Sequence, residues 1–184
     1  FMNNKINYIK VKNNEIFSSN LILKLIKKNK VLFIHQESNP INEFLDNIKI
    51  DGPAVILKSS GSSKKSKICI HPIYNLNKSA ESSGTWLKSQ GFNLSKCIIF
   101  NTLPLNHISS LMALWRSQVW HCEYINISPH LIKNTKDLMD FSLSIRDINN
   151  KKLITSLVPT QLFRLFHTKE GLNWLKLFDL IWVG

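Results

Sequence analysis

Short apolar runs alternate with helix-like stretches along this chain, and that alternation is the strongest constraint on its fold. Strand-like runs occur at residues 31–35, 54–58, 67–71, 97–101, 123–127, 153–158 and 179–183. Helix-like stretches occur at residues 42–48, 79–90, 109–119, 135–145 and 160–167. Strands that alternate with helices predict an α/β domain with a mostly parallel sheet flanked by helices. The runs at 54–58 and 67–71 are the exception, because their short connection is more typical of a hairpin.

A loop rich in serine and lysine, SSGSSKKSK at residues 59–67, connects these two runs. Gly61 lets the backbone turn without a Cβ clash, and turned backbone amides can form an anion-binding concavity. The serine hydroxyls can donate to phosphate oxygens, and the lysines supply positive charge. Two interpretations are open at this point: a phosphate-binding turn, or an exposed loop without a ligand. The candidate phosphate-binding residues are Ser59, Ser60, Gly61, Ser62, Ser63, Lys64 and Lys67.

The spacing of this loop excludes the signature of a P-loop NTPase. Ser66 and Ile68 stand where that motif requires Gly and then Ser or Thr, so its magnesium-binding hydroxyl is missing. The loop instead resembles the phosphate loop of the adenylate-forming superfamily, S/T-S-G-S/T-T-G-x-P-K. Lys64 and Ser66 depart from this pattern, where the superfamily has Gly and Pro.

Two further segments carry the same resemblance in the same order. Residues 103–109 read LPLNHIS and precede Trp115 and Arg116, which resembles the superfamily's LP-x-x-H-I segment and the helix after it. Residues 155–162 read TSLVPTQL, which resembles its V-P-T segment. Taken at their full length, these two segments are most similar to those of the o-succinylbenzoate–CoA ligases of menaquinone and phylloquinone synthesis. The resemblance covers about residues 54–184.

The resemblance implies a reaction and a set of ligands. In this superfamily a carboxylate attacks the α-phosphate of Mg-ATP to give an acyl-adenylate and pyrophosphate, and the thiol of CoA then displaces AMP. Such chemistry depends on charge neutralisation and positioning more than on a protein nucleophile. ATP, Mg²⁺, CoA and a small carboxylic acid are therefore the implied ligands. Lys67 and His107 are the implied catalytic residues, and no residue is assigned as a metal ligand.

The substrate-binding candidates are His107 and Arg116, and each has two interpretations. His107 follows a strand-like run, and it either orients a carboxylate or bonds only to backbone. Arg116 lies among apolar residues of its helix and therefore needs a partner. That partner is either an ion pair within the fold or the second carboxylate of an aromatic diacid such as o-succinylbenzoate. His71 lies within a strand and is interpreted as structural.

The placement of the three motifs favours one common site. In a doubly wound sheet, ligands bind beyond the carboxyl ends of the strands. The loop at 59–67, the segment at 103–107 and the V-P-T turn each follow the carboxyl end of a strand-like run. We therefore expect all three to line one crevice.

The formal net charge of +12 is compatible with nucleic-acid binding. However, the basic residues are spread along the chain, and only Arg116, Arg146 and Arg164 are arginines. No aromatic RNA-binding signature accompanies them, and the basic run at 24–30 is typical of the solvated face of a short helix. We expect no nucleic-acid partner. The alternative function is a non-catalytic basic α/β module that binds nucleic acid or acidic partners.

The cysteines and the apolar runs of the chain bear on metal binding, redox chemistry and location. Cys69, Cys97 and Cys122 lack the spacing of a metal site or a redox pair. Free thiols and the absence of a signal peptide favour the cytosol, and no apolar run approaches the roughly 18 residues of a membrane span.

A chain of 184 residues suits one domain with a sizeable core, but superfamily enzymes are much longer. We expect a short segment at 1–50 and an α/β portion at 51–184. The adenine-binding motifs and the C-terminal domain of the superfamily have no counterpart here, so the chain is expected to be an N-terminal fragment that is inactive alone.

Overall fold

The computed structural model describes residues 6–10, 24, 28, 30–35, 50–59, 67–128 and 130–184. Its first sheet has the strand order β1-β2-β3-β4. These strands are β1 (Ile6–Lys10), β2 (Val31–His35), β3 (Ala54–Lys58) and β4 (Ile68–Pro72). β1, β2 and β3 run parallel, whereas β4 returns antiparallel to β3. The loop at 59–67 is therefore the connection of a hairpin, as its short length predicted.

A second sheet follows, with four parallel strands in the order β6-β5-β7-β8. These strands are β5 (Cys97–Asn101), β6 (Glu123–Asn126), β7 (Lys152–Leu157) and β8 (Leu180–Val183). The α-helices are α3 (Ile73–Ser89), α4 (Ile108–Trp120), α5 (Thr135–Leu143), α6 (Pro159–Phe166) and α7 (Lys169–Leu175). Short 3-10 turns are η1 (Leu94–Lys96), η2 (Leu131–Lys133) and η3 (Ile148–Asn150).

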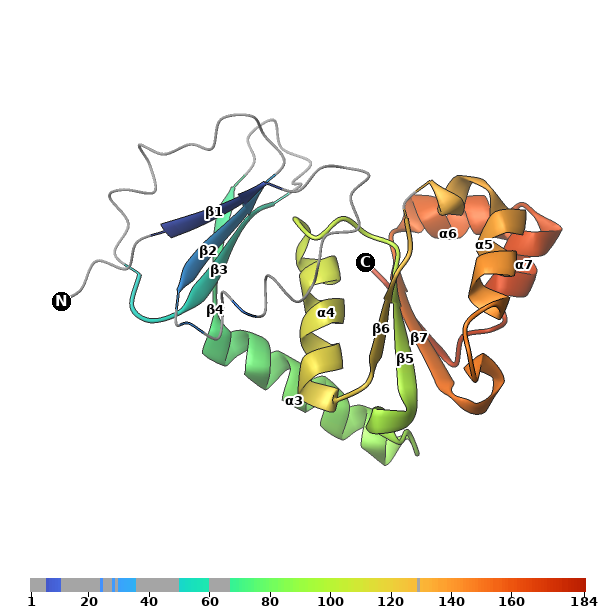
Figure 1. Cartoon of the computed structure of the whole chain (residues 1–184), viewed down its shortest axis with the longest axis horizontal. Coiled ribbons are helices and arrows are strands. Elements are labelled where there is room, and N and C mark those ends of the chain that lie inside the picture. The colour runs from blue at the N-terminus through green and yellow to red at the C-terminus, as the bar shows by residue number, and fades with distance from the viewer. Residues whose placement is uncertain are drawn as a thin grey trace.

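The elements form layers in which helices alternate with sheets (Figure 1). α3 and α4 lie between the two sheets. One buried cluster joins these helices to the first sheet, and it contains Leu32, Val55, Leu76 and Leu111. Another cluster joins them to the second sheet, and it contains Leu87, Ile99, Ala113 and Ile154. The α/β class with mostly parallel strands is therefore confirmed, although the strands divide into two sheets.

The composition of α4 explains its position between the sheets. The consecutive residues 111–115 are all buried, although successive residues of a helix point in different directions. A helix that is apolar all round is stable only when it is covered on several sides. α4 meets this condition because one sheet covers each side of it. His107 and Arg116 are consequently carried on one of the best-covered helices of the chain.

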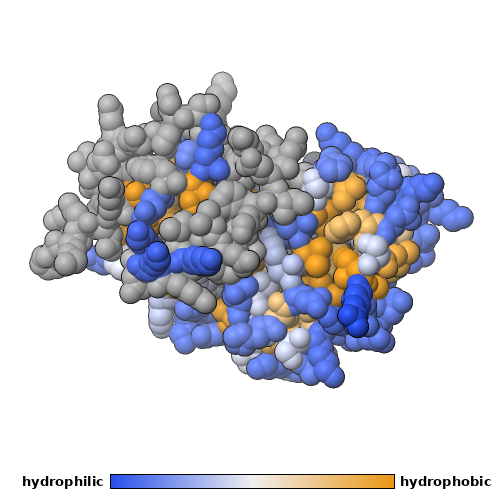
Figure 2. Space-filling view, viewed as in Figure 1, coloured by the Kyte–Doolittle hydropathy of each residue, from blue (hydrophilic) through white to orange (hydrophobic). Residues whose placement is uncertain are grey.

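α5, α6 and α7 cover the other face of the second sheet (Figure 1). Their cluster contains Phe100 and Leu153 of the sheet together with Leu138, Leu165 and Trp174 of the helices. Figure 2 shows apolar side chains on the surface over this side of the molecule. The exposed large hydrophobic residues of α5 and α6 are Phe141, Leu143, Phe163 and Phe166. This layer therefore leaves apolar surface open in the described part of the chain.

Two predicted helices lie outside the described residues: the stretch at 42–48 and most of the basic run at 24–30. Two observed elements were not predicted, namely β1 and α7. Among the helices that the structure describes, none is long and apolar enough to cross a membrane.

Candidate functional site

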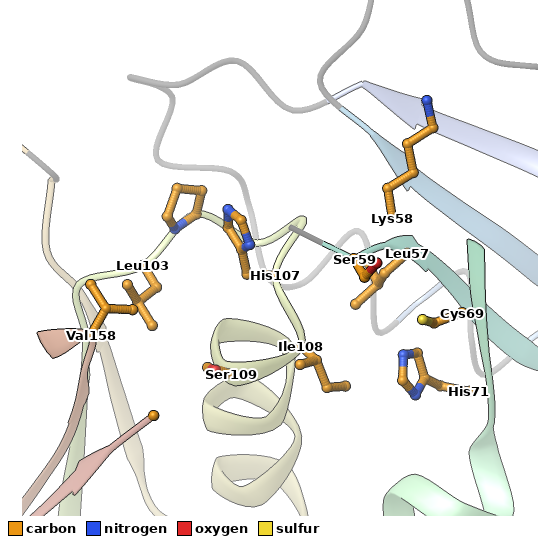
Figure 3. A pocket seen from close by; sticks show the side chains of 12 residues that line it. Leu57, Lys58, Ser59, Cys69, His71, Leu103, His107, Ile108, Ser109 and Val158 are labelled. Atoms are coloured by element: carbon orange, nitrogen blue, oxygen red, sulfur yellow. The ribbon is translucent and has the colours of Figure 1, made fainter. Parts of the chain in front are cut away.

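A cavity of about 630 Å³ lies where the carboxyl ends of strands from both sheets face each other. Its walls come from the base of the β3–β4 hairpin, the connection between β5 and α4, the first turn of α4, and the turn after β7 (Figure 3). Its lining includes Ser59, Cys69, His71, His107, Ser109 and Val158. The three segments that the sequence placed at strand ends thus border one cavity.

The base of the hairpin loop is closed by two hydrogen bonds. The Ser59 N–H donates to the carbonyl oxygen of Lys67 at 2.7 Å, and the Lys67 N–H donates to Ser59 Oγ at 3.0 Å. Ser59 lines the cavity, and Lys67 is exposed at the start of the returning strand. The other phosphate-binding candidates, Ser60, Gly61, Ser62, Ser63 and Lys64, lie outside the described residues.

His107 is the N-cap residue of α4, and its ring lines the cavity. Its backbone N–H donates to the Pro104 carbonyl at 3.1 Å, so the turn that Pro104 opens places the histidine at the helix start. Burial lowers the pKa of His107 from 6.5, because the charged imidazolium loses water. No hydrogen bond of the ring occurs within the described residues. The interpretation of His107 as a purely backbone-bonded residue therefore has no support in this geometry.

The connection after β7 is tied to the connection after β5 by one amide side chain. Gln161 Nε2 donates to the Thr102 carbonyl at 3.2 Å, while the Val158 N–H donates to Gln161 Oε1 at 3.2 Å. The Thr102 hydroxyl also donates to the Ser156 carbonyl at 3.4 Å. Gln161 therefore links two borders of the cavity, a role that the V-P-T-Q spelling alone did not reveal.

Sequence reasoning missed one wall of the cavity. Cys69 and His71 of β4 both line it, because residues two apart on a strand point to the same face. Burial lowers the pKa of His71 below 6.5, which favours the neutral ring. The spacing of Cys69 and His71, two residues apart directly after the loop, was the sequence pattern that could have predicted this wall. His71 therefore lies at the cavity rather than only within the sheet.

Arg116 lies outside this cavity but borders a second one of about 290 Å³. The two cavities share the wall residues Ile108, Ser109 and Gly184. The guanidinium stacks over the Trp182 ring, 4.3 Å from its centroid, and Nε donates to Ser83 Oγ at 3.3 Å. Burial lowers the pKa of Arg116 from its usual value, because the charged guanidinium loses water. Within the described residues no carboxylate pairs with it, so the internal ion pair, one of the two interpretations of Arg116, is not found there.

The donor set of the cavity is poor in metal ligands. Among the residues that the structure describes, no group of three or more His, Cys, Asp or Glu side chains could hold a metal ion. The described lining also contains no Asp or Glu side chain, the ligand type that Mg²⁺ prefers. These side chains therefore do not fit a resident magnesium site. The walls are mainly apolar, with cationic and neutral polar groups at the hairpin and at the start of α4.

Comparison with solved structures identifies the fold. The chain is similar to o-succinylbenzoate CoA synthetase from Bacillus subtilis in complex with the acyl-adenylate intermediate, with a TM-score of 0.51 and 18% identity over 93% of this chain. It is similar to the same enzyme in complex with ATP and magnesium ion, with a TM-score of 0.52 and 18% identity over 91% of this chain.

A third similar structure is the fatty acyl-adenylate ligase from L. pneumophila in complex with acyl adenylate and pyrophosphate. The TM-score is 0.54, with 15% identity over 96% of this chain. The alignments cover 47%, 37% and 35% of the three solved chains, so this chain spans less than half of each. No family model and no curated protein matches the chain by sequence. The chain has the fold of part of the large N-terminal domain of adenylate-forming enzymes.

Proposed function

We propose that this chain is part of an AMP-forming acid–CoA ligase that adenylates a carboxylate and then forms its CoA thioester. The observation that carries the proposal is the cavity itself. The hairpin loop, the LPLNHIS segment and the V-P-T turn are separated in sequence, yet they border one cavity at the carboxyl ends of β3, β5 and β7. The similar solved structures include complexes with ATP, with an acyl-adenylate and with pyrophosphate, which supports the same reaction class.

In this proposal the hairpin loop holds the triphosphate. Ser59 to Lys64 and Lys67 supply hydroxyl donors and positive charge, and the two bonds between Ser59 and Lys67 hold the loop's ends together. Anionic oxygens are stabilised by such donors when the donors are already in place. Magnesium enters with ATP as its complex, and no step is assigned to a magnesium ion held by the described side chains.

His107 and the start of α4 face the reacting carboxylate. The first N–H groups of a 13-residue helix carry partial positive charge, which favours an anionic group beside Ser109 and His107. The lowered pKa keeps His107 neutral near pH 7, so its ring can donate or accept one hydrogen bond without adding a charge. His107 then orients the carboxylate for attack on the α-phosphate, and the CoA thiol displaces AMP in the second half-reaction.

The acid proposed for this site is o-succinylbenzoate, an aromatic diacid. Arg116 lies nine residues beyond His107 on α4, which corresponds to roughly 13 Å along the helix axis. The second cavity continues from the first along this helix, and Arg116 borders it without a carboxylate partner among the described residues. An elongated acid can therefore place one carboxylate near His107 and the other near Arg116.

The proposal is tested by ATP–pyrophosphate exchange with the complete gene product that contains this chain. We expect exchange that depends on o-succinylbenzoate and is much weaker with benzoate, which lacks the second carboxylate. Lys67→Ala and Ser62→Ala should each lower exchange by about 10²–10³-fold, the loss typical of one transition-state donor. Lys88→Ala, at the exposed end of α3, serves as the charge-matched control. If both loop variants keep the wild-type rate of pyrophosphate exchange, the loop has no part in the mechanism.

A further inference from the structure

Two of the three cysteines stand opposite each other at the amino-terminal edge of the second sheet. The parallel register of β5 and β6 pairs Ile98 with Glu123. Cys97 is the first residue of β5 and Cys122 directly precedes β6, so extending this register by one residue sets the two cysteines against each other. Neighbouring strands lie roughly 4.8 Å apart, and disulfides join Cα atoms that are about 4.4–6.8 Å apart. The backbone spacing therefore suits a disulfide.

The two thiols also point to the same side of the sheet. Both cysteines pack in the buried cluster between the sheet and α4, where the Cys97 thiol donates to the Asn93 carbonyl at 3.3 Å. Cys97 is 1% exposed, whereas Cys122 is partly exposed. Proximity is also consistent with the pKa of Cys122, which burial, together with the nearby Cys97, raises to about 12.

The position of Cys122 is determined by the end of α4. His121 adopts a left-handed conformation with φ of 54°, and the Cys122 N–H donates to the Ser117 carbonyl at 3.0 Å. These features form a Schellman helix end, which directs the chain from the helix into β6. Figure 1 shows the end of α4 beside the starts of β5 and β6, at the sheet edge opposite the carboxyl ends. The pair is therefore separate from the cavity.

We propose that Cys97 and Cys122 form a reversible dithiol site that closes to a disulfide by exchange with a small-molecule disulfide such as oxidised glutathione. The Cys122 thiolate, the more exposed of the two, attacks one sulfur of the oxidant and releases one glutathione thiolate. The Cys97 thiolate then attacks the Cys122 sulfur, and the second glutathione thiolate leaves. The cysteines lose two electrons and two protons in total, and the oxidant is reduced to two thiols.

Burial sets the rate of this exchange. It raises the pKa of Cys97 to about 11, so few of these thiols are ionised near neutral pH. Because the thiolate is the attacking species, closure should be slow at neutral pH and accelerate by up to about tenfold for each pH unit below the thiol pKa. Cys69 lies in the distant hairpin and serves as an internal comparison.

Peptide mapping of the folded, complete protein tests the proposal. Trypsin cleavage after Lys96, Arg116 and Lys133 places Cys97 and Cys122 in the separate peptides 97–116 and 117–133. After incubation with oxidised glutathione and alkylation of free thiols, we expect these two peptides to be linked and to lose the link on treatment with dithiothreitol. Cys69→Ser should leave the link unchanged, whereas Cys122→Ser and Cys97→Ala should abolish it.

Three outcomes would overturn the proposal. The first is that both cysteines are still free thiols after the folded protein has been exposed to the oxidant for a long time at mildly alkaline pH. The second is a mixed disulfide that persists on Cys122 without closing onto Cys97. The third is a link that forms only after denaturation, because it would show that the native register does not bring the thiols together. The wild-type map decides each case even if a variant fails to fold.

Discussion

Ser59 and Lys67 hold each other's backbone across the base of the hairpin loop. The Ser59 N–H donates to the Lys67 carbonyl oxygen at 2.7 Å, and the Lys67 N–H donates to Ser59 Oγ at 3.0 Å. The Ser59 hydroxyl therefore serves as an acceptor within the fold, and its own proton can still donate to a ligand. Ser59, one of the serines proposed to bind phosphate, therefore also stabilises the base of the loop.

Removing this hydroxyl should weaken nucleotide binding by a modest amount. Ser59→Ala deletes one hydrogen bond at a partly exposed site, which is worth about 0.5–1.5 kcal/mol. We expect the KM for ATP to rise by up to about tenfold, with the midpoint of thermal unfolding nearly unchanged. Ser59→Thr keeps the hydroxyl and is the matched control. Equal KM values for Ser59→Ala and the wild type would show that the loop base does not position the nucleotide.

The environment of Arg116 makes a prediction that separates substrate binding from stability. Arg116→Leu should raise the KM for o-succinylbenzoate by about tenfold to a hundredfold, because a charge-assisted hydrogen bond is worth roughly 1.5–3 kcal/mol. The KM for ATP should scarcely change. Arg116→Lys keeps the charge but not the planar contact with Trp182. Its KM for o-succinylbenzoate should therefore lie between those of the wild type and of Arg116→Leu. A lower unfolding midpoint with an unchanged KM would make Arg116 a structural residue.

Continuous apolar runs made the inner strands predictable from the sequence. β3 and β5 were predicted residue for residue, because almost every side chain of these runs is buried. β1 was missed because Asn7 and Lys10 interrupt its pattern, and it becomes a strand by pairing with β2. α7 was missed because Gly171 is a poor helix former. In the fold that glycine is buried, and an added Cβ there would clash with the Leu165 carbonyl.

The candidate site was predictable only where it followed from strand ends. The meeting of the three motifs was inferred from the rule that parallel strands bind ligands at their carboxyl ends, and the cavity agrees with it. The contact of Arg116 with Trp182 was not predictable, because it joins α4 to β8 across the chain. The second cavity likewise depends on packing between elements distant in sequence.

Gln161 should behave as a positioning residue. Gln161→Leu leaves the Val158 N–H and the Thr102 carbonyl without their side-chain partner, at a cost of about 1–3 kcal/mol if both are deprived of water. We expect the free energy of urea unfolding to fall by that amount and pyrophosphate exchange to fall with it. Thr160→Ala, at the exposed neighbouring position, should change stability by less than about 0.5 kcal/mol. Equal stabilities of the two variants would contradict the role of Gln161.

Acid should destabilise the fold through two partly buried histidines. Burial lowers the pKa of both His71 and His107 below 6.5, so the unfolded chain binds protons more readily than the folded chain. Their contribution to stability is complete above pH 6.5 and is lost as the pH falls through the lowered pKa values. Urea unfolding between about pH 7.5 and pH 5 should show this decline. His71→Gln and His107→Gln should each flatten it, and the double variant should flatten it further.

Gly84 should be intolerant of even a methyl group, because α3 and α4 approach closely there. A Cβ at Gly84 would lie 2.6 Å from Trp120 Nε1, and the Trp120 ring cannot withdraw without losing its 2.8 Å hydrogen bond to the Ala80 carbonyl. Gly84→Ala should therefore destabilise the protein by about 1–3 kcal/mol, although alanine favours a helix. Ser82→Ala, exposed on the same helix, is the matched control for helix propensity.

A double-mutant cycle isolates this contact. Trp120→Phe removes the atom that the new methyl group would meet, so Gly84→Ala should cost less in the Trp120→Phe background than in the wild type. The free energies of urea unfolding of the four proteins give the coupling energy directly. An equal cost of Gly84→Ala in both backgrounds would mean that the helices move apart without strain. In that case the close packing of α3 on α4 would not be what keeps α4, with His107 at its start, in position between the sheets.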